Sequence, residues 1–469
     1  MGPGYSIENQ AVHVAFDPVA PKIHVDAEYQ LRNSGNQTLS VLEVRLPGRL
    51  SFDVANVQIA WDGGTLSAEP SPSNPRDTVL QLPGRWKIAE RHTLHISSDF
   101  QPPPAGDSHF RFTADAFFLP SEGWVPELLP ARGFIASGGV PPKQWRLAVS
   151  LPQGFLVHTS GRSIKTSRGG GQVVATQTPE DRYPFIVAGK YREMSLNAGQ
   201  QRVIFWSRSA KEAGREQDSA EVLSRVVQTY NQTFGNRTKT PQPLWIVECP
   251  VVQGCFSTER SYYAEFLGVE PGTVSSEMAS ADTLLTNFSG AAPTLAAAAP
   301  GLAASWLGYG QNPGFYEQQP PLSAFPAFAA SLGREAVLGP AARLEAIRAA
   351  LHAIPSAAAS QQAPLRRARV QQEERPPVVR AKSFLFFYAL EDRYGAEVFR
   401  RAIAHMLSAR RGGGFDLADL IAAFEEETHQ NVAEFVRLWM KHPGVPDDFR
   451  ARYESAASAL GITSKENRP

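Results

Sequence analysis

One stretch near the middle of this chain decides how the rest is interpreted, and it reads Pro300-Gly301-Leu302-Ala303-Ala304-Ser305-Trp306-Leu307-Gly308. Positions 300 and 304 lie about one turn apart on a helix, so their side chains share one face. Neither proline nor alanine offers a lone pair to a metal ion, and glycine at 301 cannot act as a general base. The stretch therefore predicts a helix without metal chemistry.

The sequence around this stretch is mostly alanine from Ala291 to Gly308 and contains Pro293 and Pro300. It is too weakly hydrophobic to span a membrane, and we expect a buried helix instead. The whole chain has 469 residues, of which 46 are basic and 46 acidic. A formal charge of zero gives no basis for binding nucleic acid or an anionic membrane through bulk charge. We therefore expect no nucleic-acid partner and no direct membrane insertion.

Residues 1–195 carry the pattern of an antiparallel β-sandwich. Short runs of alternating apolar and polar residues recur there, separated by Gly, Pro, Asn and Asp. These runs cover residues 11–16, 22–25, 42–46, 92–96, 145–149 and 185–188. Short strands at this spacing are typical of a sandwich.

The remainder of the chain changes character, which predicts an α+β multidomain protein. Residues 196–355 mix strands with helices, and residues 378–469 are predicted to be α-helical, with Asp416 as a helix N-cap. Between them, residues 356–377 have the composition of an exposed linker or lid. Within the middle part we expect strands at 202–206, 244–247 and around 262–267, and helices at 217–234 and from about 279 onward.

The compartment stays open at this level. Met1-Gly2-Pro3-Gly4 has neither a charged segment nor an apolar one after it, so no signal peptide is predicted. That start fits a cytoplasmic protein, whereas a leader or anchor upstream would make the protein extracytoplasmic or membrane-associated. The two cysteines, Cys249 and Cys255, fit either a small disulfide loop in an oxidising compartment or two unpaired thiols.

Five motifs in order along the chain resemble the membrane alanyl aminopeptidase family of zinc metallopeptidases, which are gluzincins. They are Gly123-Trp124-Val125-Pro126, Leu151-Pro152-Gln153-Gly154-Phe155, the strand Tyr183 to Tyr191, Trp306-Leu307-Gly308, and Trp439 to Pro446, which is similar to the family's W-x-x-x-P-G-x-P element. The resemblance implies a saddle-like N-terminal β-sandwich, a thermolysin-like α+β domain, and helices that complete the peptidase-like domain.

The residues that perform catalysis in that family are missing at the matching positions. The family's active-site helix reads H-E-x-x-H-x-W-x-G. In this chain Pro300 and Ala304 stand at its two histidine positions, and Gly301 stands at its glutamate position. The resemblance puts the third zinc ligand at Ser323 or Ala324, and neither is a carboxylate. The family's transition-state tyrosine stands two residues before a lysine. Lys382 matches the lysine, and Arg380 stands in place of the tyrosine.

The family's G-x-M-E-N loop, which grips the substrate amine, is also altered. Its match is Gly254-Cys255-Phe256-Ser257-Thr258, with Ser257 at the glutamate position, and Glu259 would replace that glutamate only after a shift. The resemblance implies an expected cleft lined by this loop, Trp306 and Lys382. Joint loss of ligands, base and tyrosine points to relaxation of the whole catalytic set, since none supports turnover alone.

Other chemistry has little support in the sequence. No two of the ten histidines are four residues apart, and His92 and His95 would point to opposite faces of one strand. Cys255 or Ser257 would need a base to act as a nucleophile, and no histidine lies within fifty residues of them. We therefore favour a rebuilt loop over a new nucleophile, and we expect no metal and no cofactor.

Three hypotheses for function remain. The first is a catalytically inactive aminopeptidase-like protein, a pseudopeptidase, acting as a binding or scaffold module for a peptide or protein partner. The second is an active zinc aminopeptidase with a displaced metal site. The third is a soluble subunit of a membrane-anchored assembly, which a large apolar surface patch would mark. Whether the protein is an enzyme depends on the site rather than on the fold.

Overall fold

The structure is a computed structural model in which the chain divides into two compact units, Met1–Tyr191 and Arg192–Pro469. We describe each unit by itself. The residues that the structure describes are 4–20, 22–46, 53–71, 77–101, 111–120, 123–131, 139–159, 163–166, 172–177, 184–208, 213–237, 242–250, 264–267, 276–280, 282–288, 290–306, 320–354, 377–409 and 415–459.

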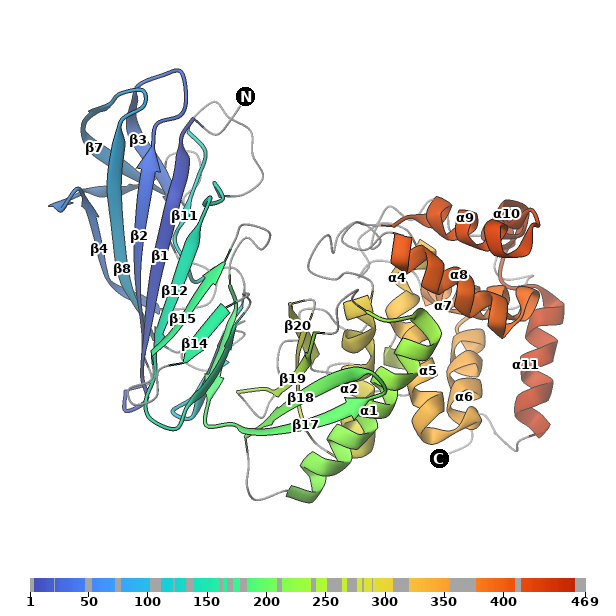
Figure 1. The fold of residues 1–469 in the computed structure, drawn as a ribbon. Helices are drawn as coiled ribbons and strands as arrows, with labels where there is room; N and C mark the ends of the chain where they lie inside the picture. The colour runs from blue at the N-terminus through green and yellow to red at the C-terminus, as the bar shows by residue number, and fades with distance from the viewer. Residues whose placement is uncertain are drawn as a thin grey trace. The chain divides into compact units, whose positions relative to one another are not determined.

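The described residues of the N-terminal unit form three sheets, and the alternating pattern predicted the strands that build them (Figure 1). The largest has eight strands, in the order β14 (Ser163–Thr166), β15 (Gln172–Gln177), β12 (Trp145–Ser150), β1 (Ser6–Asp17), β2 (Lys22–Arg32), β8 (Arg91–Gln101), β4 (Asp53–Trp61) and β5 (Gly64–Thr65). The two others have four strands each. One contains β13 (Leu156–Thr159), β16 (Ile186–Gly189), β10 (Ala116–Leu119) and β9 (Arg111–Phe112), and the other β11 (Glu127–Leu128), β3 (Leu39–Arg45), β7 (Thr78–Trp86) and β6 (Ala68–Pro70).

One hydrophobic core joins these three sheets. Val14 and Val25 of the large sheet, Phe117 of the sheet that contains β10 and Leu80 of the sheet that contains β7 are all fully buried in it. Burial alternates along β2, because successive side chains point to opposite faces of a strand. The pairings in the unit are antiparallel except for β1 with β12, which run parallel after a long connection. The prediction of a β-rich N-terminal region is therefore confirmed.

The C-terminal unit combines a five-stranded sheet with helices, which confirms the α+β class. The strand order is β17 (Arg192–Ala198), β18 (Gln201–Ser207), β19 (Leu244–Glu248), β21 (Thr283–Thr286) and β20 (Ser276–Ser280), with β18, β19 and β21 parallel. The helices are α1 (Ala213–Phe234), α2 (Ala291–Trp306), α4 (Pro320–Ser323), α5 (Phe325–Leu338), α6 (Pro340–His352), α7 (Pro377–Tyr394), α8 (Ala396–Ala409), α9 (Leu417–Thr428), α10 (Val432–Lys441) and α11 (Asp447–Ala459).

Two expectations for this unit are wrong. The predicted strand around 262–267 contains a short 3-10 helix, Ala264–Leu267, in its described part. Its residues Phe266 and Leu267 are both buried. The helical region predicted from about 279 first forms β20 and β21, and α2 begins only at Ala291.

Helices α4 to α11 gather beside α1 and α2 on the side away from the sheet (Figure 1). The last of them closes the bundle, because Arg450 on α11 donates to the carbonyls of Leu351 and Ile354 at the end of α6, at 3.4 and 2.9 Å. Tyr453 on the same helix donates to Asp392 on α7 at 2.9 Å. Among the described residues, none of the helices is both long and apolar enough to cross a membrane.

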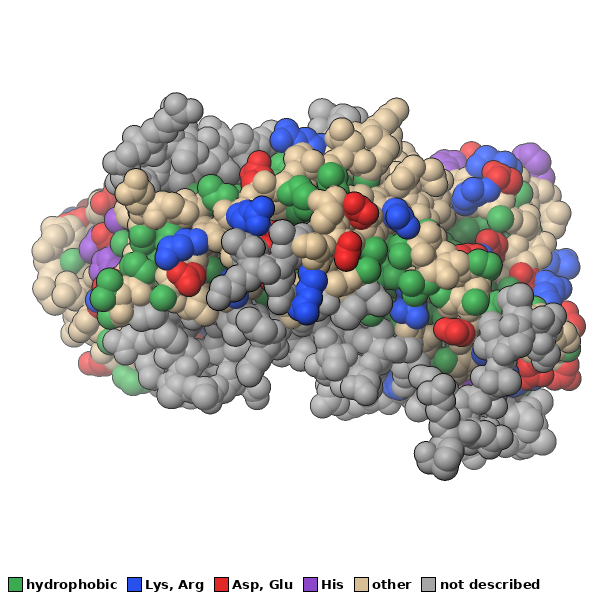
Figure 2. Space-filling view, turned by 90° about the horizontal axis from the view of Figure 1, so that it is seen from below, with side chains coloured by type: hydrophobic (Ala, Val, Ile, Leu, Met, Phe, Trp, Pro, Cys, Tyr) green, Lys and Arg blue, Asp and Glu red, His purple; other side chains and the backbone are tan. Residues whose placement is uncertain are grey.

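Charged side chains are mixed over the face of the molecule drawn in Figure 2. Lys and Arg alternate with Asp and Glu there, and neither sign gathers into a patch on the coloured part of that face. This mixture on the coloured part of that face agrees with the equal numbers of basic and acidic residues in the sequence.

Asp416 caps α9 as predicted. Its carboxylate accepts from the N–H of Asp419 at 2.9 Å, and the Asp419 carboxylate accepts from the N–H of Asp416 at 2.9 Å, which forms a capping box. We predict that Asp416→Ala lowers the free energy of unfolding by about 1 kcal/mol, because the backbone N–H of Asp419 loses its side-chain acceptor. Urea unfolding measures this, with the exposed Asp218→Ala on α1 as the control. An equal effect of both substitutions would contradict the capping role.

Candidate functional site

The helix that corresponds to the expected zinc helix is α2, and it lies in the core of the C-terminal unit. It packs against α1, α5 and the two strands β20 and β21. Pro300 stands inside it and has no N–H, so the helix loses one internal hydrogen bond there. Two side chains from neighbouring elements donate to carbonyls just before this proline. Tyr230 on α1 reaches Ala299 at 3.0 Å, and Ser276 on β20 reaches Ala297 at 2.6 Å.

Gly301, at the position of the family's glutamate, touches the strands so closely that it leaves no room for a side chain. A Cβ placed on it would lie 2.7 Å from Cδ1 of Leu284 and 2.9 Å from Oγ of Ser276. Real Cβ contacts essentially never fall below 3.0 Å. The side chains of Leu284 and Ser276 would therefore have to shift to admit a side chain at this position.

The remaining positions of this stretch are apolar and buried. Leu302 and Ala303 are fully buried, and Ala304, at the second histidine position, is 6% exposed. Ser305 turns its hydroxyl back onto the carbonyl of Leu302, at 2.7 Å. These side chains offer packing surface and no ligand atoms for a metal.

Trp306 anchors the end of α2 to the end of α1. Its indole N–H donates to the carbonyl of Gly235 at 3.0 Å, and its ring meets that of Tyr230 edge to face at 5.4 Å between centroids. Gly235 has φ of 75°, a conformation that glycine adopts without strain. The contacts of Trp306 are those of a buried structural residue.

Ser323 and Ala324, the two candidates for the third ligand, stand at the junction of α4 and α5. Ser323 is 4% exposed and Ala324 is fully buried. The carbonyl of Ala324 accepts the N–H of Phe328, which starts α5. Helix α5 packs against α2, and both α4 and α5 pack against α7, so these predicted positions lie on neighbouring elements around one core.

Arg380 and Lys382 both lie on α7, near its N-terminus. Arg380 is half-buried, and Lys382 is fully buried. The Lys382 ammonium donates to the carbonyl of His442, the residue that caps the C-terminus of α10. Burial lowers the pKa of Lys382 to about 8, because an ammonium group loses hydration in the core. The negative end of the α10 dipole offsets part of that cost.

The altered substrate loop lies outside the described residues, and this applies to each of its predicted site residues, Gly254, Cys255, Phe256, Ser257 and Glu259. Cys249, at the end of β19, is 1% exposed and disulfide-bonded.

Across the described ranges, no three His, Cys, Asp or Glu side chains come close enough to hold a metal ion. His92 and His95 both lie on β8 and contact different partners. His92 meets Asp62 at 2.6 Å and stacks on Trp61, whereas His95 pairs with Asp26. The two histidines thus share no ligand geometry in the structure.

A polar cluster that sequence reasoning missed ties α5, α6 and α7 together. Arg343 binds Glu335 at 3.3 Å and also Glu391, and its guanidinium lies 5.0 Å from the ring centroid of Tyr388. The Tyr388 hydroxyl bonds to Ser331, and burial raises the pKa of Tyr388 well above its usual range. These residues come from three helices, so no local pattern in the sequence signals them.

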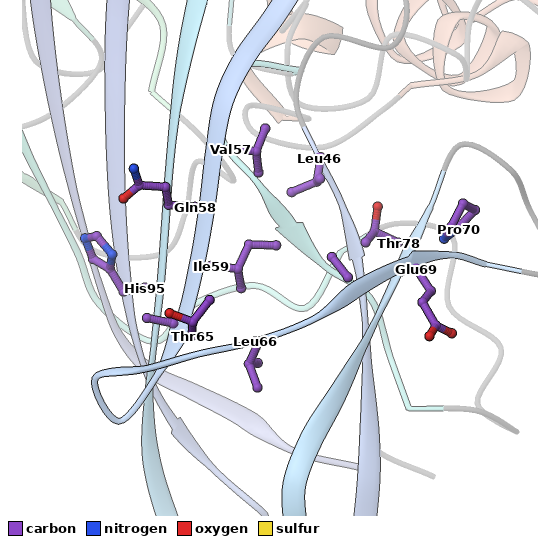
Figure 3. Close-up of a pocket in the computed structure, with 12 residues that line it drawn as sticks. Leu46, Val57, Gln58, Ile59, Thr65, Leu66, Glu69, Pro70, Thr78 and His95 are labelled. Atoms are coloured by element: carbon purple, nitrogen blue, oxygen red, sulfur yellow. The ribbon is translucent and has the colours of Figure 1, made fainter.

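A cavity of about 620 Å³ lies in the N-terminal unit, at the edge between two sheets (Figure 3). Leu46, Val57, Ile59 and Leu66 give it an apolar floor, and Thr78 adds a hydroxyl. None of the site residues predicted from the sequence lines it. It is therefore a separate feature from the elements around α2.

Comparisons with known proteins support the fold. No family profile and no curated protein matches the sequence. The structure is similar to the M1 zinc metallopeptidase from Deinococcus radiodurans, with a TM-score of 0.54, 16% identity, and coverage of 94% of this chain and 95% of that one. A mutant of that enzyme has a TM-score of 0.55 and 16% identity, with coverage of 94% of this chain and 96% of that one. A mutant bound to a Tyr-Ser-Ala substrate has a TM-score of 0.53 and 17% identity, with coverage of 94% of this chain and 95% of that one.

The chain has the fold of the M1 zinc metallopeptidases. These neighbours cover both units, in keeping with the order of motifs along the sequence. Identity of 16–17% speaks for the architecture and leaves the chemistry of the site to be judged from its residues.

We predict that Gly301→Glu, which restores the family's residue, destabilises the protein. Leu284 and Ser276 would have to move to admit a side chain, and overpacking of this kind costs about 1–3 kcal/mol. Gly214→Glu on α1 is the control, because a Cβ there meets nothing within 4 Å. Urea unfolding of both variants checks the prediction, and a neutral Gly301→Glu would show that the strands yield easily.

Lys382 should make stability rise with pH. Its folded pKa of about 8 lies below the reference value of 10.5, so the unfolded chain binds more protons between these values. Stability is then lowest below pH 8 and recovers as the pH rises toward 10.5, by about 1–3 kcal/mol. Comparing the wild type with Lys382→Met by urea unfolding at pH 7.5 and 9.5 tests this. The rise should be smaller in the variant, and parallel curves would contradict it.

Proposed function

We propose that this protein is a catalytically inactive relative of the M1 peptidases that serves as a binding or scaffold module. The observation that carries the proposal is the packing around Gly301, where a Cβ would lie 2.7 Å from Cδ1 of Leu284 and 2.9 Å from Oγ of Ser276, so that neither a base nor room for one is present. Pro300 and Ala304 add no donor atoms at the two histidine positions, and Ser323 and Ala324 offer no carboxylate. A peptide carbonyl in such a site would meet no Lewis acid and no base.

The partner that we propose is a peptide or a protein. A solved neighbour with this fold holds a Tyr-Ser-Ala substrate, so a peptide is the class of ligand to test first. Binding without hydrolysis would agree with the substitutions at α2. Fluorescence anisotropy with labelled tripeptides, followed by mass spectrometry of the recovered peptide, measures both properties in one sample.

Purified protein should contain less than about 0.1 zinc ion per chain and should not hydrolyse aminoacyl arylamides, because the residues at the ligand positions supply no donor atoms. Elemental analysis after dialysis against micromolar zinc, together with an arylamide assay with and without a chelator, makes the measurement. An active M1 peptidase assayed in parallel is the control. Stoichiometric zinc, or hydrolysis that a chelator abolishes, would favour an active enzyme with a displaced metal site instead.

A further inference from the structure

The ammonium group of Lys382 is the most unusual buried charge in the described part of the C-terminal unit. The side chain is fully buried, and its single recorded hydrogen bond goes to the carbonyl of His442. That carbonyl also accepts the N–H of Gly444 at 3.0 Å. Lysine is rarely fully buried without a charged partner, and its ammonium carries three donors. Within the described part of the chain, two donors of the Lys382 ammonium therefore have no acceptor.

Two more buried polar atoms belong to the same end of α10. The indole Nε1 of Trp439 and the imidazole Nδ1 of His442 have no hydrogen-bond partner within the described structure. Trp439 is 3% exposed. The two residues are three apart in sequence, which places their side chains on one face of the helix end.

Helix α7 presents Lys382 to this same region. Phe386, one turn after Lys382, lies beside the ring of Trp439, with 6.5 Å between the ring centroids. The Lys382 ammonium, one turn before Phe386 on α7, donates to the carbonyl of His442 just after α10. The ring contact between Phe386 and Trp439 and the hydrogen bond from Lys382 to His442 together place Lys382 beside the end of α10.

The chemistry of these three groups is one-sided. An ammonium and an indole only donate hydrogen bonds, and Nδ1 of a neutral imidazole donates in one of its two tautomers. None of the ion pairs found among the described residues involves Lys382. Buried donors held on adjoining parts of α7 and α10, with no carboxylate paired to them among the described residues, suit an oxyanion, since charge-assisted hydrogen bonds are the strong ones.

We propose that Lys382, Trp439 and His442 form a binding site for a small oxyanion, either a carboxylate or a phosphate group. The inference goes beyond the proposed function and is independent of it, because it holds whether or not α2 supports hydrolysis. Zinc content and arylamide hydrolysis test the first proposal, and anion binding tests this one, so each can fail alone.

The full-length chain provides the experiment. Thermal unfolding is compared in sodium acetate, sodium phosphate and sodium chloride at equal ionic strength and pH 7. We expect acetate or phosphate to raise the midpoint by about 2–4 °C over chloride, because a ligand of the folded state stabilises it. Lys382→Met should lose this shift. Lys441→Met, which removes an exposed lysine of the same helix end, should keep it.

A second variant guards against a folding defect. If Lys382→Met fails to fold by circular dichroism, Trp439→Phe removes the indole donor and keeps most of the ring packing. We expect it to weaken acetate or phosphate binding about threefold to tenfold by calorimetry. A tripeptide with a free C-terminal carboxylate, compared with its amide, then separates a peptide source from a free anion.

Three results would overturn the proposal. They are equal midpoints in all three salts, an anion-dependent shift that survives in Lys382→Met, and binding that is unchanged in Trp439→Phe. Each is the outcome expected if buried water alone satisfies these donors.

Discussion

The contact of α2 with strands β20 and β21 is the constraint on which the site depends. Ser276 and Leu284 lie so near Gly301 that a single added carbon would clash with them. In a close-packed interior a helix can approach a sheet this closely only where one partner carries no side chain. Glycine at position 301 thus allows α2 to pack against the side chains of β20 and β21, and it also leaves the position without a base.

Close packing also accounts for the proline in the same helix. Pro300 removes one internal hydrogen bond, and Tyr230 and Ser276 donate hydrogen bonds to the carbonyls of Ala299 and Ala297 in the turn before it. An active-site helix that had to present ligands on a fixed face would tolerate this less well. Here α2 acts as a core helix that α1, α5 and the sheet hold from several sides.

The sequence predicts the architecture better than the details of its middle part. Alternation along β2 and the cap at Asp416 are local signals, so both features could be derived from neighbouring residues. The strands β20 and β21 were missed because Thr283–Thr286 is buried on both faces and gives no alternation. Ser323 and Ala324 were located through family resemblance, whereas the partner of Lys382 sits sixty residues further along the chain. Contacts of that kind arise from the tertiary fold, and a single sequence does not reveal them.

The hydrogen bonds from α11 to the end of α6 affect the order in which the C-terminal unit can fold during synthesis. Arg450 holds the last carbonyls of a helix made about a hundred residues earlier, and Tyr453 reaches back to Asp392. Until α11 has been synthesised, those carbonyls must be hydrated by water. The end of α6 therefore gains these partners only after α7 to α10 have been made, and a chain truncated before Arg450 would leave it uncovered.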